Sequence, residues 1–273
     1  RPCRGRAGDG RRGGAGCAST RGAPMRLTGA VVLVTGASSG IGAAVVRRLA
    51  GAGSQVVAAG RDADRLARLA AQTGATTIVS DLGRPHAGRE LAEQALARHT
   101  RVDVLVNNAG VGWAGPFGGM ADALADELLA VNLRAPIELT RALLPGMCHR
   151  GGHLVFVGSI AGRLGVDGES VYAATKAGLD TFAQSLRMEL AGRRVGVSTV
   201  VPGVVDTPFF VRRGQPYRRR RPRPVPPERV ADALVDAIVR DRAEVYVPGW
   251  LRLPVAVRGL LPGLYRRLAT RFG

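Results

Sequence analysis

Short apolar runs alternate with longer amphipathic stretches along most of the chain, beginning near Ala30. Short apolar runs bounded by turn residues are typical of buried strands, whereas apolar positions spaced three and four residues apart are typical of helices. The predicted strands span residues 30–35, 55–59, 76–80, 102–107, 153–158, 195–201 and 244–247. The predicted helices span residues 40–52, 62–72, 87–99, 124–150, 170–191 and 227–240.

Regular alternation of strands and helices predicts an α/β fold: a doubly wound parallel sheet of six to seven strands, of the Rossmann type, with helices on both faces. The chain has 273 residues, of which 46% are hydrophobic, and this suits one large domain with a sizeable core. We therefore expect a single domain over residues 25–248. No apolar run reaches the ~20 residues that a membrane-spanning helix requires.

The two ends of the chain differ from this pattern. Residues 1–24 are rich in glycine and arginine and lack periodicity and a signal-peptide core, so we expect a disordered leader outside the native domain, with Met25 as the true start. A basic tail that binds polyanions is the alternative. Residues 249–273 form a basic, apolar extension, and Pro254 and Pro262 predict that it is not a single helix. This extension could contact a membrane surface peripherally, pack on a neighbouring subunit or cover a pocket.

The net charge of +18 is concentrated in residues 1–24, 212–223 and 252–271, and the rest of the chain is nearly neutral. Aromatic residues make up 4% of the chain and no nucleic-acid-binding motif is present, so we expect no specific nucleic acid partner. The cysteines are few and scattered, which fits a reducing compartment and predicts a cytoplasmic protein. The histidines show no metal-ligand spacing, so we expect no metal site.

A glycine-rich turn follows the first predicted strand and reads G-A-S-S-G-I-G over residues 36–42. Glycines allow positive φ angles and let the backbone approach a ligand closely. The helix that follows presents free N–H groups and a partial positive charge, which together suit a pyrophosphate. A purely structural turn is the alternative. The G-x-S-x-G spacing around Ser38 also matches a hydrolase nucleophile elbow, but no histidine follows His153 to complete a triad.

Tyr172 and Lys176 lie four residues apart in the predicted helix 170–191, so both side chains leave one helix face. A neighbouring ammonium lowers the pKa of a tyrosine from about 10, which produces an acid or base suited to neutral pH. Lys176 is the only lysine of the chain. Ser159 follows the predicted strand 153–158, at the sheet edge where ligands bind. Taken singly, Ser159 is also typical of a helix cap and Tyr172 of a core edge.

In their order along the chain these motifs resemble the classical short-chain dehydrogenase/reductase family, over about residues 25–210. The family pattern consists of T-G-x-x-x-G-x-G, N-N-A-G, a helical Asn, a Ser, Y-x-x-x-K and P-G-x-x-x-T. The matching positions are residues 35–42, residues 107–110, Asn132, Ser159, Tyr172, Lys176 and residues 202–207.

The resemblance implies a Rossmann-type catalytic domain that transfers a hydride between NAD(P) and a carbonyl or alcohol. By that likeness Tyr172 donates or accepts the proton, Ser159 polarises the substrate oxygen, and Lys176 lowers the pKa of Tyr172 and binds the nicotinamide ribose. Asn132 would hold a water in a proton relay to Lys176. The residues implied in cofactor binding are Gly36, Ser38, Ser39, Gly40, Ile41, Gly42, Arg61, Asp81, Leu82, Asn108, Ala109, Gly110, Tyr172, Lys176, Pro202, Gly203, Val205 and Thr207.

The end of the second predicted strand bears on the choice between NADP and NAD. An acidic residue there binds the ribose 2′-OH of NAD, whereas an arginine accommodates the 2′-phosphate of NADP. Gly60 occupies the position where an acid would stand, and Arg61 follows it, so we predict that NADP is preferred, with Ser38 assisting Arg61. Asp62 is the competing signal for NAD, although we favour it as the N-cap of the next helix.

These observations predict an oxidoreductase that uses NADPH to reduce a lipophilic or acyl ketone or aldehyde, a small-molecule substrate. Residues 207–227 are rich in proline and arginine and are expected to form a substrate lid. Family likeness implies a homo-dimer or homo-tetramer through helices 124–150 and 170–191. The alternative is a non-catalytic Rossmann module that senses the cofactor or binds a partner, which loss of Tyr172 or Lys176 would have favoured.

Overall fold

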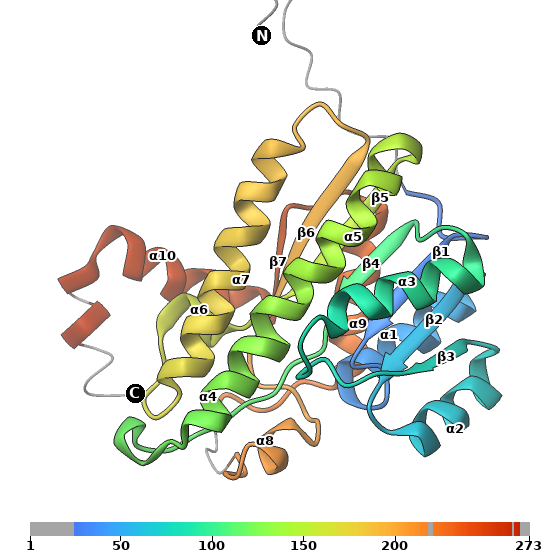
Figure 1. Ribbon diagram of the computed structural model, residues 1–273. Coiled ribbons are helices and arrows are strands. Elements are labelled where there is room, and N and C mark those ends of the chain that lie inside the picture. Colours follow the sequence, from blue (N-terminus) through green and yellow to red (C-terminus); the bar gives the residue numbers. More distant parts are fainter. Residues whose placement is uncertain (1–24, 218–220, 264, 268–273) are drawn as a thin grey trace, which may run out of the picture.

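The computed structural model describes residues 25–217, 221–263 and 265–267, so the predicted leader 1–24 lies outside the described residues. Seven parallel strands form one sheet in the order β3-β2-β1-β4-β5-β6-β7, which confirms the predicted doubly wound sheet (Figure 1). The strands are β1 Val31–Thr35, β2 Gln55–Gly60, β3 Thr76–Val79, β4 Val104–Asn107, β5 Gly152–Val157, β6 Val195–Pro202 and β7 Glu244–Val247.

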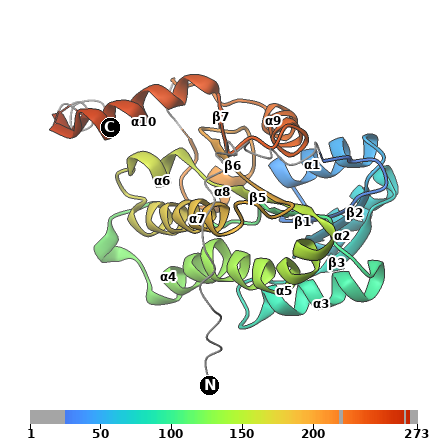
Figure 2. The same ribbon diagram turned by 90° about the horizontal axis from the view of Figure 1, so that it is seen from above.

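Three long helices cover each face of the sheet, as Figure 2 shows. The first layer contains α1 Gly40–Gly51, α2 Ala63–Thr73 and α9 Pro227–Val239, and the second contains α3 Ala87–His99, α5 Ala135–Arg150 and α7 Ser170–Glu189. The short elements are η1 Phe117–Gly119, α4 Asp122–Leu129, η2 Ala130–Arg134, α6 Ile160–Leu164, α8 Phe209–Arg212, η3 Gly249–Leu251 and α10 Arg252–Leu260.

Because a layer of helices covers each face of the sheet, the amino-acid sequences of the strands are mostly continuous apolar runs. Along β1, Val32 and Val34 pack in the core on the α1 and α9 side, while Val31 and Leu33 pack in the core on the α3 and α5 side. Successive side chains of a strand point to opposite faces, and both faces here are buried. All five residues of β1 are accordingly buried.

Two helical predictions need correction. The predicted helix 124–150 is helical over its length but contains the π-helical turn η2, so it divides into α4, η2 and α5. Single π-turns inside α-helices often occur at functional sites. Pro254 does not break the C-terminal extension, because it lies in the first turn of α10, where a backbone N–H has no helical partner. The helix ends at Leu260, two residues before Pro262.

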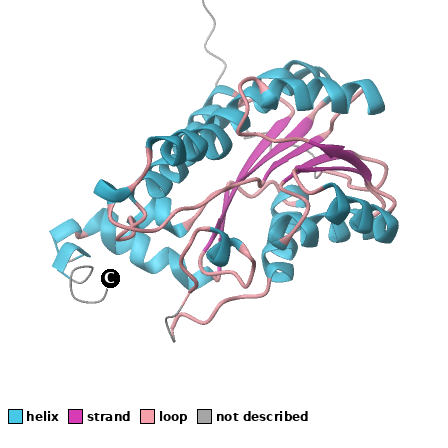
Figure 3. Ribbon diagram, turned by 60° about the horizontal axis from the view of Figure 1, so that its bottom comes forward, coloured by secondary structure: helices cyan, strands magenta, loops and turns pink. Residues whose placement is uncertain are grey.

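The loops that follow the strands gather at one edge of the sheet, which Figure 3 brings forward. From β1 the chain adds β2 and β3 toward one edge of the sheet, and from β4 it adds β5, β6 and β7 toward the other edge. Strand order therefore reverses between the neighbouring strands β1 and β4. In open parallel sheets this switch point opens a crevice at the carboxyl ends of the strands. Among the described residues, no helix combines the length and the hydropathy needed to cross a membrane.

Candidate active site

A cleft with a volume of about 2360 Å³ opens at the carboxyl edge of the sheet. That volume exceeds the range of about 300–1,000 Å³ typical of drug-sized ligands and suits a dinucleotide together with a substrate. Of the predicted site residues, all except Gly42 and Asn132 line the cleft. Those that line it are Gly36, Ser38, Ser39, Gly40, Ile41, Arg61, Asp81, Leu82, Asn108, Ala109, Gly110, Ser159, Tyr172, Lys176, Pro202, Gly203, Val205 and Thr207.

The glycine-rich turn between β1 and α1 is closed so tightly that its glycine positions admit no side chain. A Cβ atom on Gly42 would lie 2.2 Å from the Gly36 carbonyl oxygen. Gly36 has φ of +66°, a conformation that favours glycine. Ser39 caps α1 without a side-chain hydrogen bond to the helix. The backbone N–H groups of the first turn therefore face the cleft, and the turn fits a pyrophosphate well.

Asn108 and Thr35 hold this turn against the end of β4. The Asn108 Nδ2 group donates to the Thr35 carbonyl at 2.8 Å and to the Gly36 carbonyl at 3.3 Å. The Thr35 hydroxyl accepts from the backbone N–H groups of Asn108 and Ala109, each at 3.0 Å. These bonds join the two strands at the switch point and set the width of the crevice.

At the end of β2, the position where an acidic residue would bind NAD is occupied by Gly60, which has no side chain. Asp62 caps α2: its carboxylate accepts from the Arg65 N–H at 2.9 Å and pairs with the Arg65 guanidinium at 3.1 Å. The Asp62 carboxylate is thus already engaged, as the N-cap interpretation predicted. Arg61 pairs with the exposed carboxylate of Glu127 at 3.2 Å. Ser38 lies beside Gly60, whose added Cβ would be 3.3 Å from the Ser38 hydroxyl oxygen.

Ser159, Tyr172 and Lys176 meet on the other side of the cleft. Ser159 follows β5 and caps α6, with its hydroxyl accepting from the Ala161 N–H at 3.2 Å. Tyr172 and Lys176 come from the buried face of α7. Ser159 hydrogen-bonds the Tyr172 side chain, and Lys176 Nζ donates to the Val157 carbonyl at 2.9 Å. The carboxyl end of β5 therefore positions all three side chains.

Burial governs the acidity of this group. Burial raises the pKa of the Tyr172 phenol to about 12, and the hydrogen bond with Ser159 acts in the opposite direction. Burial also lowers the pKa of the Lys176 ammonium to about 8. The net effect is a raised pKa of Tyr172, because desolvation of the phenol outweighs the contacts that favour the phenolate. The prediction that Lys176 lowers this pKa stays a prediction.

Asn132 lies in the π-turn η2 and is fully buried. Its Oδ1 accepts from the Val111 N–H at 2.9 Å, and its Nδ2 donates to the Val111 carbonyl at 2.9 Å and to the Thr175 hydroxyl at 3.1 Å. The side chain thus fixes the loop after β4 against α7. An added Cβ on Gly110 would lie 3.3 Å from Asn132 Oδ1 and 3.4 Å from Lys176 Nζ, so both side chains border the same backbone segment.

The segment after β6 forms an excursion over the cleft. Its ends are joined where Val205 pairs with Val225 in a parallel bridge, which encloses most of the predicted lid 207–227. Residues 218–220 of this lid lie outside the described residues. Within it, α8 places the Phe209 ring 5.5 Å from the Tyr172 ring. An added Cβ on Gly112 would meet the same ring at 2.5 Å, so this glycine makes room for Phe209.

The sequence does not single out two arginines that contact the site, one at the end of α8 and one directly after it. Arg212 Nη1 donates to the Ser39 hydroxyl at 3.2 Å, at the N-terminus of α1. Arg213 forms a partly buried ion pair with Glu169, the N-cap residue of α7. The lid thereby contacts both the glycine-rich turn and the helix of Tyr172. No local signal could have marked these arginines, since they belong to a run of like residues.

The comparisons with known proteins agree with this geometry. A family described as short chain dehydrogenase matches residues 30–217. The ketoacyl reductase HetN of a Nostoc species is 36% identical over 259 residues, which cover 90% of each chain.

Two solved structures share the fold. One is a short chain dehydrogenase/reductase from Burkholderia phymatum in complex with NAD: its TM-score is 0.80 at 26% identity, covering 88% of this chain and 96% of that one. The other is a metagenomic short-chain oxidoreductase in complex with NADP: its TM-score is 0.69 at 35% identity, covering 81% and 96%. The family match over more than half of the chain shows that this protein belongs to the short-chain dehydrogenases, oxidoreductases that act on CH–OH or C=O groups with a nicotinamide cofactor.

Proposed function

We propose that this enzyme uses NADPH to reduce a lipophilic or acyl ketone or aldehyde, with Asn132, Ser159, Tyr172 and Lys176 as its catalytic group. The observation that carries the proposal is the meeting of Ser159, Tyr172 and Lys176 in the cleft that also contains the glycine-rich turn. In the reduction, Tyr172 would be the proton donor, because burial raises its pKa to about 12 and the phenol is protonated at neutral pH.

In this proposal, each side chain has a distinct task. The Ser159 hydroxyl hydrogen-bonds the substrate carbonyl oxygen and orients it toward the Tyr172 hydroxyl. Tyr172 donates its proton to that oxygen as negative charge develops there. The Lys176 ammonium, with a pKa near 8, is mostly charged at neutral pH and stabilises the phenolate that remains. Asn132 keeps the loop after β4 in place beside Lys176.

The bound nicotinamide cofactor supplies the hydride. The chain would contribute its placement: the N-terminus of α1 would receive the pyrophosphate, and Asp81 and Leu82, which line the cleft after β3, would border the adenine. Val205 and Thr207, which line the cleft after β6, would hold the carboxamide.

An apolar wall supports the choice of a lipophilic or acyl substrate. Aromatic and aliphatic side chains make up much of the lining of the cleft, and such pockets take apolar ligands with a few polar groups for orientation. They include Val111, Trp113, Phe117, Leu164, Val166, Phe209, Phe210, Tyr217, Trp250 and Leu251.

The function is tested first by titrating the full chain with NADPH and NADH, followed by reduced-nicotinamide fluorescence. A screen of aliphatic and aromatic ketones and aldehydes then follows NADPH oxidation. We expect saturable NADPH binding and turnover of apolar carbonyl compounds. Failure to bind either nucleotide, or binding without turnover of any carbonyl compound, would contradict the proposal.

Cofactor preference depends on Arg61. We expect Arg61→Gln to weaken NADPH binding by about tenfold or more, because a charge-assisted hydrogen bond to the 2′-phosphate contributes about 1.5–3 kcal/mol. NADH binding should stay within about twofold, since NADH has no such phosphate. Arg68→Gln is the matched control, because Arg68 is exposed on α2 but does not line the cleft. An unchanged ratio of the two dissociation constants would refute the role of Arg61 and point to Asp62.

Arg212 should act on both nucleotides alike. Its guanidinium lies 3.2 Å from Ser39, beside the expected pyrophosphate position, so Arg212→Gln is expected to weaken NADPH and NADH binding by a similar factor, roughly 3–10-fold at low salt. The loss should shrink at high salt, where wild-type binding is also screened. Arg212→Lys should restore part of the affinity. Equal affinities of wild type and Arg212→Gln at low salt would show that the lid arginine does not contact the cofactor.

We also propose that the protein forms a homo-dimer or homo-tetramer through the helices α4, α5 and α7. These helices lie on the same face of the sheet (Figure 2). Their outer surfaces expose Leu124, Leu129 and Met188, the last with 71% of its surface exposed. A second copy would cover these apolar side chains.

A further inference from the structure

The C-terminal helix α10 forms an outlying edge of the molecule, as Figures 1 and 2 both show. It packs against α6, the short helix that begins after Ser159. The Tyr265 hydroxyl donates to the Leu164 carbonyl at 2.9 Å, and Arg258 donates to the Arg163 carbonyl. Arg252 Nη2 donates to the Glu244 carbonyl at 3.2 Å. The helix is therefore attached along one side, and its other side faces outward.

The outward side of this segment is apolar. Trp250, Leu253, Leu260 and Leu261 expose 51%, 68%, 81% and 54% of their surfaces. Trp250 and Leu253 are three residues apart, and Leu260 follows Leu253 by seven, which places them on one helix face. Leucines exposed to this degree two turns apart on one helix face are unusual on a protein surface without a partner.

The charged side chains of this segment itself are all positive. From Val245 to the end of the chain there is no acidic residue. Arg252, Arg258, Arg266 and Arg267 are exposed beside the leucines. A basic segment with tryptophan and leucine on its apolar side has the composition of a helix that lies in a membrane interface.

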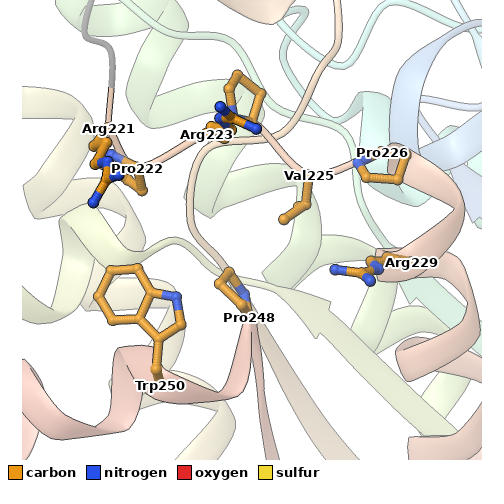
Figure 4. A pocket seen from close by; sticks show the side chains of 9 residues that line it. Arg221, Pro222, Arg223, Val225, Pro226, Arg229, Pro248 and Trp250 are labelled. Atoms are coloured by element: carbon orange, nitrogen blue, oxygen red, sulfur yellow. The ribbon is translucent and has the colours of Figure 1, made fainter.

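A basic pocket adjoins the same face at Trp250 (Figure 4). It has a volume of about 840 Å³ and is lined by Arg221, Arg223 and Arg229 together with prolines and the Trp250 ring. Within the described part of the chain, none of these three arginines pairs with a carboxylate. Arg229 stands in the first turn of α9, next to Glu228.

We propose that Trp250, Leu253, Leu260 and Leu261, with the arginines of this pocket, form a docking surface for a lipid bilayer that contains anionic lipids. The leucines would enter the boundary of the acyl chains, Trp250 would lie at headgroup depth, and the pocket would receive a lipid phosphate. Charge favours a bilayer over a second copy of this chain. Two copies that met at this face would bring two arginine-rich surfaces together, whereas an anionic bilayer neutralises them.

Docking at this surface would turn the mouth of the cleft toward the lipid. Trp250 and Pro222 line both the basic pocket and the cleft, and Leu251 and Pro254 line the cleft from the same segment. A lipophilic carbonyl compound could then pass from the bilayer to Tyr172 without crossing water. This consequence rests on the proposed function, whereas the docking surface itself does not.

Vesicle flotation with the full chain tests the docking surface directly. We expect the protein to float with vesicles of phosphatidylcholine and phosphatidylglycerol, to float much less with phosphatidylcholine alone, and to dissociate as salt is raised. The double variant Leu253→Ser/Leu260→Ser should lose about tenfold or more of its partitioning. Arg223→Gln/Arg229→Gln should lower partitioning onto anionic vesicles by a similar factor, about tenfold or more, because two positive charges are removed.

Two control variants separate this surface from general stickiness. Val79→Ser removes an exposed apolar side chain from β3, with 58% of its surface exposed, and Arg68→Gln/Arg89→Gln removes two exposed charges elsewhere. Both should partition like the wild type. Each variant is also titrated with NADPH. We expect an unchanged NADPH affinity, which would show that the variant is folded. NADPH binding thus reports on the proposed function separately from vesicle binding.

Absence of wild-type flotation with anionic vesicles would overturn the proposal, as would equal partitioning of the wild type and Leu253→Ser/Leu260→Ser. A third result would also overturn it: wild-type dimers in light scattering that dissociate in the leucine variant, without vesicle binding, would assign the face to a second copy of the chain.

Discussion

Replacing Tyr172 with phenylalanine is expected to lower kcat for carbonyl reduction by about 10²–10⁴-fold, the range for loss of a positioned acid. Phenylalanine keeps the ring that packs against Phe209, so the fold and the lid contact should remain. NADPH affinity should stay within about twofold. The loss would therefore appear in the chemical step, and single-turnover measurements of NADPH oxidation at saturating cofactor would locate it there.

Tyr246→Phe is the matched control for this experiment. Tyr246 lies in β7, is also buried, and likewise has its pKa raised to about 12 by burial, but it does not line the cleft. Loss of its hydroxyl should leave kcat almost unchanged. If Tyr172→Phe retained wild-type kcat, or if both variants lost activity equally, Tyr172 would not be the proton donor.

Gly42→Ala should disrupt the cofactor cradle. The added Cβ would lie 2.2 Å from the Gly36 carbonyl oxygen and 2.6 Å from Asn108 Nδ2, so the turn and the end of β4 must move apart. Overpacking of this kind typically costs about 1–3 kcal/mol, which for a chain of this size lowers the melting temperature by roughly 3–10 °C. We expect NADPH affinity to fall by tenfold or more, because the displaced N–H groups no longer converge on the pyrophosphate.

Gly51→Ala provides the control at the other end of the same helix. A Cβ there would meet no atom within 4 Å, and alanine is the better helix former, so this variant should be as stable as the wild type or slightly more stable. Thermal unfolding and NADPH titration of the two variants side by side check the prediction. A Gly42→Ala protein that melts and binds like Gly51→Ala would show that the turn is not under the inferred constraint.

Much of the fold could be predicted because its signals are local. Each strand is a short apolar run that is buried on both faces, and β7 begins and ends at the predicted residues. Asp62 is predicted to be a helix N-cap, and Ser159 is a residue type common at helix caps. Both side chains accept a hydrogen bond from a backbone N–H of the helix that follows. The π-turn η2 was not predicted; within it Asn132 bonds Val111, a residue that only packing brings beside it.

The site was partly predictable for the same reason. Tyr172 and Lys176 share a face through helix geometry alone, and the spacing of Gly36, Gly40 and Gly42 marks a tight turn at a helix start. The contact between Arg212 and Ser39 joins residues 173 positions apart, and Arg212 is one of several neighbouring arginines. No pattern along the chain distinguishes the arginine that reaches the cleft from those that do not.

The sequence by itself determined the strands and helices and the doubly wound sheet. It also determined that a nucleotide-type turn and a Tyr–Lys pair lie at the carboxyl edge of that sheet. Periodicity and short motifs act over a few residues, so these features can be predicted locally. Tertiary structure alone decided three further features. It set the acidity of Tyr172 and Lys176, since desolvation depends on the whole surrounding core. It brought the lid onto the cradle, and it turned the leucines of α10 outward beside the basic pocket, because only packing decides which side of an amphipathic segment finds a partner.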